Sequence, residues 1–448
     1  MKSSQTRTGK GPDAPSVPGT RPSVPGTRPQ LLAGWGRREF TPSLPFPLAG
    51  FVTRKDRLAD RVRDPLAATA VVLSGTTGPV AFVSIDLLIV DEALFAAVRG
   101  KLAPLGVDSV FLNATHTHSS LGGYVEGRGA RLFMGTYRPE TRDHIAGAVE
   151  AAVREALGDM SPVSALHRGH ALAPGITMNR RHRGGPPDDR ISVLRLTRTR
   201  GLPILLFSVS GHPVIVSSMD AHAASADVPG DCSAALGKLG FLPAFVSGPG
   251  GGLNLLFPEM LTSVEAHMAL LTRTIVAAAQ EALSQAVPMP VRHAHLAMEV
   301  LEFRRRFPPT SGGPAGKAMK SAVTAAVGHG FSRFVGPGGH RAVAPVTVLR
   351  IGDAALVGMP ADFGVESALA LRDRIQADCG LFSIVSSQTN GYAGYAHPAS
   401  DYAWKDSAVD AFFFYENAMA WFGPTVADDC SQRALKLLSA ASPSQPES

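Results

Sequence analysis

Apolar runs typical of β-strands alternate with amphipathic helical patterns over most of the chain, and this alternation restricts the possible folds more than any other feature. Residues 79–88 form a nearly continuous apolar run, as expected for a strand that is covered on both faces. A helical pattern follows at 91–102, with Asp91 as a residue suited to start it, and the next apolar run is 109–115. This alternation predicts an α/β fold in which mixed β-sheets are flanked by helices in a layered sandwich.

The same alternation continues toward the C-terminus. We expect further strands at 68–73, 191–196, 203–209, 244–247, 343–351, 354–357 and 381–387. We expect further helices at 139–157, 259–285 and 365–377.

The two ends of the chain are predicted to lie outside the core. Residues 1–30 contain a proline-rich near-repeat and are predicted to be a disordered tail, and 433–448 are predicted to be a flexible C-terminal tail. Residues 31–432 are then predicted to form one large domain. Within it, 304–340 are rich in glycine and proline and form an excursion from the core that is a candidate lid.

Histidines follow two of the predicted strands. His116 and His118 come directly after the run at 109–115, and side chains two residues apart in an extended segment point to the same face. His212 follows the run at 203–209. Four residues are therefore candidate ligands of a metal: His116, His212, Asp362 and Tyr395. In α/β folds, bound molecules lie at the carboxyl ends of strands.

Each of these residues also has a structural interpretation. The histidine pair is also consistent with two hydrogen-bonded side chains, and His212 with a loop histidine before a proline. Asp362 precedes a predicted helix and is an equally suitable N-cap. Tyr395 is also consistent with a packing tyrosine, in which case Tyr392 is the alternative occupant of the site.

Composition excludes several classes of protein. The formal charge is +6, but part of it lies in the first 28 residues, and the basic clusters at 180–183 and 304–306 have no interleaved aromatic residues, so no nucleic-acid partner is expected. The three cysteines show no Cys-x-x-Cys spacing, which argues for free thiols. No apolar run has the length of a signal peptide core or a transmembrane helix, so we expect a cytoplasmic protein, with transient contact to a membrane surface left open.

Several short motifs carry a family resemblance that covers about residues 31–430. They are Asp64-Pro-Leu66, Ser84-Ile-Asp86, Thr115-His-Thr-His-Ser119, Asn179-Arg-Arg181, His212-Pro-Val214, Ser225-Ala-Asp227, the glycine-rich loop ending at Asn254, Met359-Pro-Ala-Asp-Phe363 and Asn390-Gly-Tyr-Ala-Gly-Tyr395. Together and in this order, they resemble the catalytic domain of the neutral (neutral/alkaline, non-lysosomal) ceramidase family, which are zinc-dependent amide hydrolases.

The resemblance implies a fold of mixed sheets flanked by helices and a set of site residues. One zinc ion per chain would be bound by His116, His212, Asp362 and Tyr395. It further implies that His118 faces the substrate or stabilises the oxyanion, that Arg180 contacts the polar head of the substrate, that Asp227 orients a metal-bound histidine, and that Gly251, Asn254 and Tyr392 bind substrate.

The chain departs from the family pattern at two places. Pro360-Ala-Asp362 stands where the family has Pro-Gly-Glu, and the loop Gly251-Gly-Leu-Asn254 lacks the Gly-Asp-Val-Ser pattern. The function that follows is a zinc-dependent hydrolase that cleaves an N-acyl amide of a lipid or small molecule by a metal-activated water. The alternative is a catalytically degenerate member that binds a ligand or partner without turnover.

Overall fold

The computed structural model describes residues 30–50, 57–127, 130–182, 184–256, 262–304, 341–402, 416, 419–420 and 422–440. The predicted tail at 1–30 lies outside these residues except for its last position. Residues 305–340 of the candidate lid and 441–448 of the predicted C-terminal tail also lie outside them.

Two sheets form the centre of the molecule. The larger one contains β1 (Leu32–Glu39), β5 (Ala67–Gly75), β6 (Gly78–Ile85), β7 (Ser109–Ala114), β8 (Ser161–Leu172), β10 (Arg190–Arg198), β11 (Ile204–Val209), β13 (Leu242–Ser247) and β15 (Val287–Met289). Their order is β13-β11-β10-β8-β1-β5-β6-β7, with β15 paired to β8. The smaller sheet has the order β16 (His295–Arg304), β17 (Arg341–Ile351), β18 (Ala354–Gly358) and β20 (Phe382–Ser386). Both sheets are mixed, because β6–β7, β11–β13 and β18–β20 are parallel and most other pairs are antiparallel.

The remaining elements are helices and short strands. The helices are α1 (Glu92–Leu102), α2 (Arg131–Met134), α3 (Pro139–Gly158), α4 (Ile215–Met219), α5 (Asp227–Lys238), α6 (Val264–Ser284), α9 (Val365–Cys379) and α11 (Val426–Ala440), with 3-10 turns η2 (Ala103–Leu105) and η4 (Ala399–Tyr402). The short strands are β2 (Phe46–Pro47), β3 (Leu58–Ala59), β4 (Arg61–Val62), β9 (Thr177–Asn179), β12 (Ala223–Ala224), β14 (Leu253–Leu255), β19 (Asp362–Phe363) and β21 (Tyr395–Ala396).

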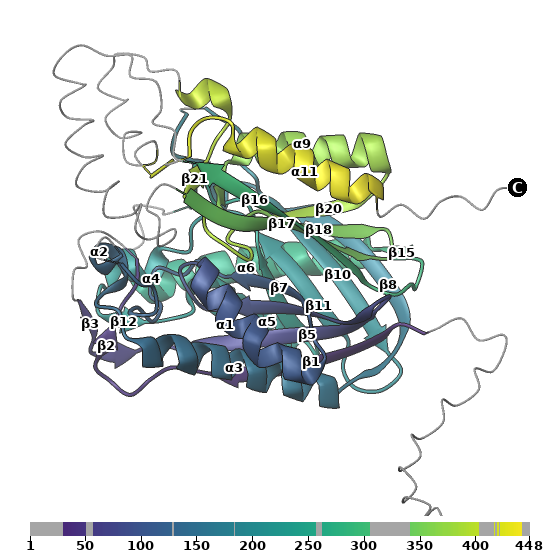
Figure 1. Cartoon of the computed structure of the whole chain (residues 1–448), viewed down its shortest axis with the longest axis horizontal. Helices are drawn as coiled ribbons and strands as arrows, with labels where there is room; N and C mark the ends of the chain where they lie inside the picture. Colours follow the sequence, from purple (N-terminus) through teal and green to yellow (C-terminus); the bar gives the residue numbers. More distant parts are fainter. Residues whose placement is uncertain are drawn as a thin grey trace, which may run out of the picture.

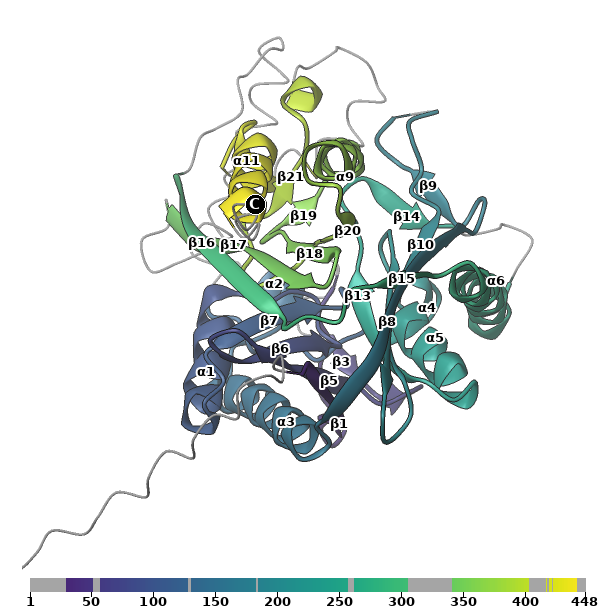
Figure 2. The same cartoon turned by 90° about the vertical axis from the view of Figure 1, so that its right-hand side faces the viewer.

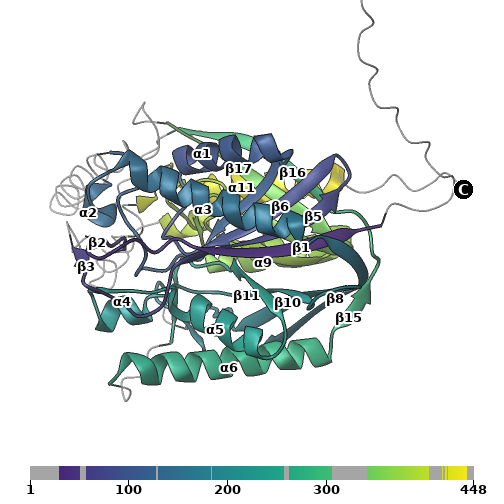
Figure 3. The same cartoon turned by 90° about the horizontal axis from the view of Figure 1, so that it is seen from below.

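The sheets pack face to face, and helices cover their outer faces. Along β11, Ile204 and Leu206 point into a core shared with the smaller sheet, whereas Leu205 and Phe207 point toward α5 and α6. This division follows from the period of two in a strand. Helices α9 and α11 lie on the smaller sheet (Figures 1 and 2), and α1 and α3 lie on the opposite side of the molecule from α5 and α6 (Figure 3). The predicted α/β layered sandwich is confirmed.

Most predicted elements are confirmed as well. The helices predicted at 91–102, 139–157 and 365–377 are α1, α3 and α9, and the side chain of Asp91 caps α1 by accepting a hydrogen bond from the Leu94 amide. The strand predicted at 79–88 ends earlier, at Ile85. Helix α6 begins at Val264, because Ser263 caps its first turn.

The predicted C-terminal boundary is wrong. Residues 433–440 belong to α11 and are not a flexible tail, because Ala434 and Leu438 are buried and the helix packs against β16, β17 and α9. Strands β8 and β16 and helix α5 were not predicted. In the described part of the chain, no helix is long and apolar enough to cross a membrane.

Candidate metal centre

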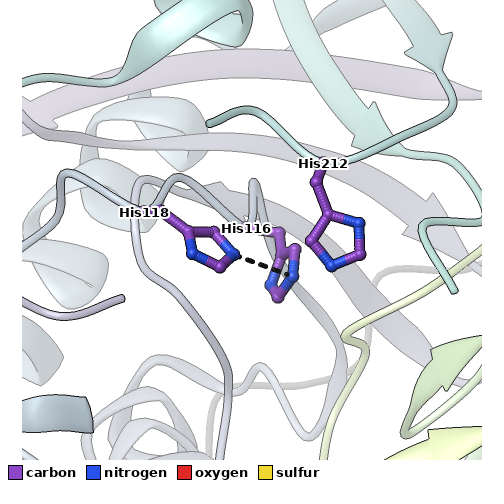
Figure 4. A group of neighbouring side chains, drawn as sticks. All are labelled: His116, His118 and His212. Atoms are coloured by element: carbon purple, nitrogen blue, oxygen red, sulfur yellow. Dashed lines mark hydrogen bonds between the residues drawn. The ribbon is translucent and has the colours of Figure 1, made fainter. Parts of the chain in front are cut away.

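Three buried histidines meet where strands β7 and β11 end (Figure 4). His116 and His118 follow β7, and His212 follows β11; one ring nitrogen from each histidine lies within 4.8 Å of those of the other two. Nε2 of His118 and Nε2 of His116 are 3.4 Å apart. His116 has a φ of 65°, a left-handed conformation that is uncommon for a residue with a side chain and that occurs preferentially at functional sites.

Backbone carbonyls orient two of the rings. Nδ1 of His116 donates to the carbonyl of Leu88 at 2.6 Å, and Nδ1 of His212 donates to the carbonyl of Leu253 at 2.9 Å. Since a carbonyl only accepts, each Nδ1 carries the hydrogen and each Nε2 has the lone pair that can bind a metal. Burial, together with nearby Arg180, holds the pKa of His212 well below its usual range, which favours the neutral form that binds metals.

Asp362 and Tyr395 complete this group. They are direct partners in the parallel pair β19–β21, so the two side chains enter the site together. Asp362 Oδ1 lies 3.4 Å from His116 Nε2 and 3.9 Å from His212 Nε2, and the Tyr395 hydroxyl lies 3.3 Å from His212 Nε2. Tetrahedral zinc with bonds of about 2.0–2.1 Å keeps its ligand atoms about 3.3 Å apart, so these separations suit one metal ion.

The structure decides two of the alternatives. Asp362 is not a helix N-cap, because Gly364 occupies the N-cap of α9 and the Asp362 carboxylate instead accepts from Gln388 and Tyr392. Tyr395 is the tyrosine beside His212. The hydroxyl of Tyr392 instead donates to Oδ2 of Asp362 at 3.0 Å.

Arg180 lies behind Tyr395 in a buried ion pair. Its guanidinium donates to the Tyr395 hydroxyl at 3.2 Å, to Asn254 Oδ1 at 2.7 Å and to Glu416 Oε1 at 2.5 Å. Glu416 also accepts from Arg181 at 2.6 Å. Burial alone would raise the pKa of Glu416, but Arg180 and its other charged neighbours lower it to about 2.

Sequence reasoning missed Glu416, as well as the amide of Gln388. Glu416 follows an aromatic run that does not end a predicted strand, and its partner Arg181 is 235 residues away. Nothing local marks either residue as part of the site.

Asp227 does not have the predicted role. Its carboxylate accepts hydrogen bonds from the amides of Val216 and Val228 at 2.9 and 2.8 Å, and so joins α4 to the start of α5. The prediction that it orients a metal-bound histidine is wrong, since backbone carbonyls hold Nδ1 of both His116 and His212.

Gly251 lies against the chain that carries Asp362. Its amide donates to the carbonyl of Phe363 at 3.0 Å, and its carbonyl accepts from the amide of Val365 at 3.1 Å. Asn254 forms a β-bridge with His212 in addition to its contact with Arg180. The substrate-binding role of Gly251, Asn254 and Tyr392 stays a prediction.

A narrow pocket opens beside the group. Its polar lining residues are His116, His118, Asp362, Tyr392 and Tyr395, and its other walls are apolar. The lining residues are Gly50, Leu88, Ile89, His116, His118, Phe133, Met134, Asp362, Tyr392, Tyr395 and Met419. Its cavity volume is about 20 Å³, room for a single water molecule, so the described residues leave space here for one small polar group beside apolar walls.

No protein-family model matches the sequence, and no curated protein sequence matches it. Solved structures do. The neutral ceramidase from Pseudomonas aeruginosa superposes with a TM-score of 0.76 at 19% identity, over 92% of this chain and 74% of that one. A structure described as ceramidase complexed with C2 gives a TM-score of 0.76 at 18% identity, over 92% and 75% of the two chains. The chain therefore has a neutral ceramidase-like fold.

Proposed function

We propose that this protein is a zinc-dependent hydrolase that cleaves the amide bond of an N-acyl lipid or a related small molecule. The observation that carries the proposal is the meeting of four side chains from separate segments, His116, His212, Asp362 and Tyr395. Asp362 Oδ1 lies 3.4 and 3.9 Å from Nε2 of the two histidines, and the Tyr395 hydroxyl lies 3.3 Å from His212 Nε2. The neutral ceramidase-like fold supports the same reaction class.

The donor atoms fit zinc. Two unprotonated imidazole nitrogens, a carboxylate oxygen and a phenol oxygen are nitrogen and oxygen ligands of the kind that zinc accepts. When bound, zinc would lower the pKa of a coordinated water or polarise the carbonyl of the scissile amide.

The residues around this centre divide the remaining tasks. His118 lies beside His116 and lines the pocket, where it can donate to the oxyanion of the tetrahedral intermediate or transfer a proton to the leaving amine. Arg180 has contacts with Tyr395, Asn254 and Glu416, which favour a role in holding the Tyr395 hydroxyl over a direct contact with a substrate head group.

The pocket indicates the kind of substrate. Leu88, Ile89, Phe133 and Met134 line it close to the candidate ligands and would exclude water from the reacting carbonyl. The cavity itself encloses only about 20 Å³, but its apolar lining favours an acyl chain over a charged group beside the candidate ligands. The proposed substrate is therefore a lipid amide of the ceramide type.

Metal analysis and a substrate screen test the proposal. The wild-type protein should hold about one zinc per chain, and His116→Ala and His212→Ala should each lose it. His222→Ala is a matched control, because His222 is exposed and outside the site. The zinc-loaded wild type is then assayed on N-acyl amides that include ceramides. Full zinc in both site variants would refute the centre, and bound zinc without turnover of any amide would favour a binding protein that has lost catalysis.

A further inference from the structure

Gln388 lies against the carboxylate of Asp362. Its side chain is fully buried, and Nε2 donates to Asp362 Oδ1 at 2.6 Å. The same oxygen faces His116 Nε2 at 3.4 Å. Tyr392 donates to the other oxygen, Oδ2, at 3.0 Å. Both carboxylate oxygens are thus held from outside the histidine group, and each keeps a second lone pair, since a carboxylate oxygen accepts at two positions.

The backbone of Gln388 joins the two segments that carry the candidate ligands. Its amide donates to the carbonyl of Ala361, directly before Asp362, at 3.1 Å. Its carbonyl accepts from the amide of Ala114, two residues before His116, at 3.1 Å. One residue therefore connects the end of β7 to the start of β19, and its side chain contacts the carboxylate that faces the histidines.

Packing alone does not explain a glutamine here. Gln388 has a φ of 54°, a left-handed conformation that is unfavourable for residues with a side chain. Its Oε1 is buried and accepts no hydrogen bond from the described residues. An unmade buried hydrogen bond costs stability, whereas an apolar side chain of similar length would avoid that cost. The contact with Asp362 is what the glutamine adds.

We propose that Gln388 is a positioning residue that holds the Asp362 carboxylate, with the help of Tyr392, in the orientation that binds the metal. This inference rests on the proposed zinc site. Aspartate has a short side chain whose carboxylate reaches a metal only over a narrow range of rotamers, so donors that fix its orientation raise the metal affinity.

Zinc affinity, measured by competition with a chelator, tests the proposal without any assay of activity. Gln388→Met keeps the side-chain length and removes the amide, and it should weaken zinc binding about 10–100-fold. The absorption spectrum of the cobalt-substituted variant should also change, because the carboxylate would be free to rotate. Gln376→Met is the matched control: Gln376 is exposed on α9, and its substitution should leave both measurements unchanged.

A double-mutant cycle separates positioning from general stability. In an Asp362→Ala background, Gln388→Met should cause no further loss of zinc affinity, since its effect passes through the carboxylate. If Gln388→Met does not fold, Gln388→Asn is the second variant. Asparagine tolerates left-handed backbone, and its amide is one methylene too short for the 2.6 Å contact, so the same weakening is expected.

The outcomes distinguish this inference from the proposed function. Wild-type zinc binding with unchanged affinity in the folded Gln388 variant would overturn the positioning role and leave the zinc site standing. Equal losses in the wild-type and Asp362→Ala backgrounds would also overturn it. A wild type that binds no zinc would refute both the site and the role of Gln388.

Discussion

Replacement of Gly251 by alanine should damage the metal centre although Gly251 contributes no side chain to it. A Cβ at Gly251 would lie 2.7 Å from the carbonyl oxygen of Asp362 and 2.8 Å from the carbonyl carbon and oxygen of Phe363. These are backbone atoms, so no side-chain rotation relieves the overlap. The hydrogen bonds of Gly251 to Phe363 and Val365 also hold the two segments together.

The size of the effect follows from these distances. Ordinary contact of a Cβ begins at 3.4 Å, so β19 must move away by the difference between 3.4 and 2.7 Å, which is 0.7 Å. Overpacking of this kind costs about 1–3 kcal/mol of unfolding free energy. Metal–ligand distances tolerate shifts of only about 0.2 Å, so displacement of Asp362 should also weaken zinc binding by at least about tenfold.

Gly250 provides the matched control. A Cβ there would meet the ring of His212 at 3.6 Å and Asp362 Oδ1 at 3.7 Å, both ordinary contact distances. Urea unfolding and chelator competition should therefore show Gly250→Ala close to wild type and Gly251→Ala impaired in both. Equal stability and equal zinc affinity for the two variants would refute the reasoning. A rise in KM with unchanged zinc affinity would instead support the predicted substrate-binding role of Gly251.

Two further predictions concern catalysis and pH. His118→Ala should keep zinc at the wild-type level and lower kcat for the best amide substrate by about 10²–10³-fold, with little change in KM. Loss of zinc from this variant would indicate that His118 is itself a ligand. Asp86 is buried at the end of β6, and burial raises its pKa to about 7, so the folded state keeps a proton that the unfolded state releases near 3.8. The unfolding free energy of the wild type should therefore fall as pH rises from about 4 to 7. In urea unfolding, Asp86→Asn should be more stable than wild type by up to about 4 kcal/mol at pH 8 and no more stable at pH 4. The same difference in stability at both pH values would contradict this role of Asp86.

The sequence by itself determined the layered α/β class and the positions of most core elements. The apolar run of β11 and the helical stripe of α1 with its Asp91 cap are local patterns, so they appear in the sequence as they do in the fold. Histidines after apolar runs and the family resemblance also pointed to His116, His212, Asp362 and Tyr395, which the structure brings together.

The tertiary structure alone decided how these residues are held. Gln388 meets Asp362 across 26 residues, Arg181 meets Glu416 across 235, and Asp227 turned out to support α5 and not a histidine. The backbone hydrogen bonds of Gly251 to Phe363 and Val365 and the burial of α11 likewise depend on which segments pack together. Local sequence patterns report which face of an element is apolar and where it ends. The partner of a polar side chain is set by the packing of distant segments, because a buried donor or acceptor must find its hydrogen bond wherever the fold places one.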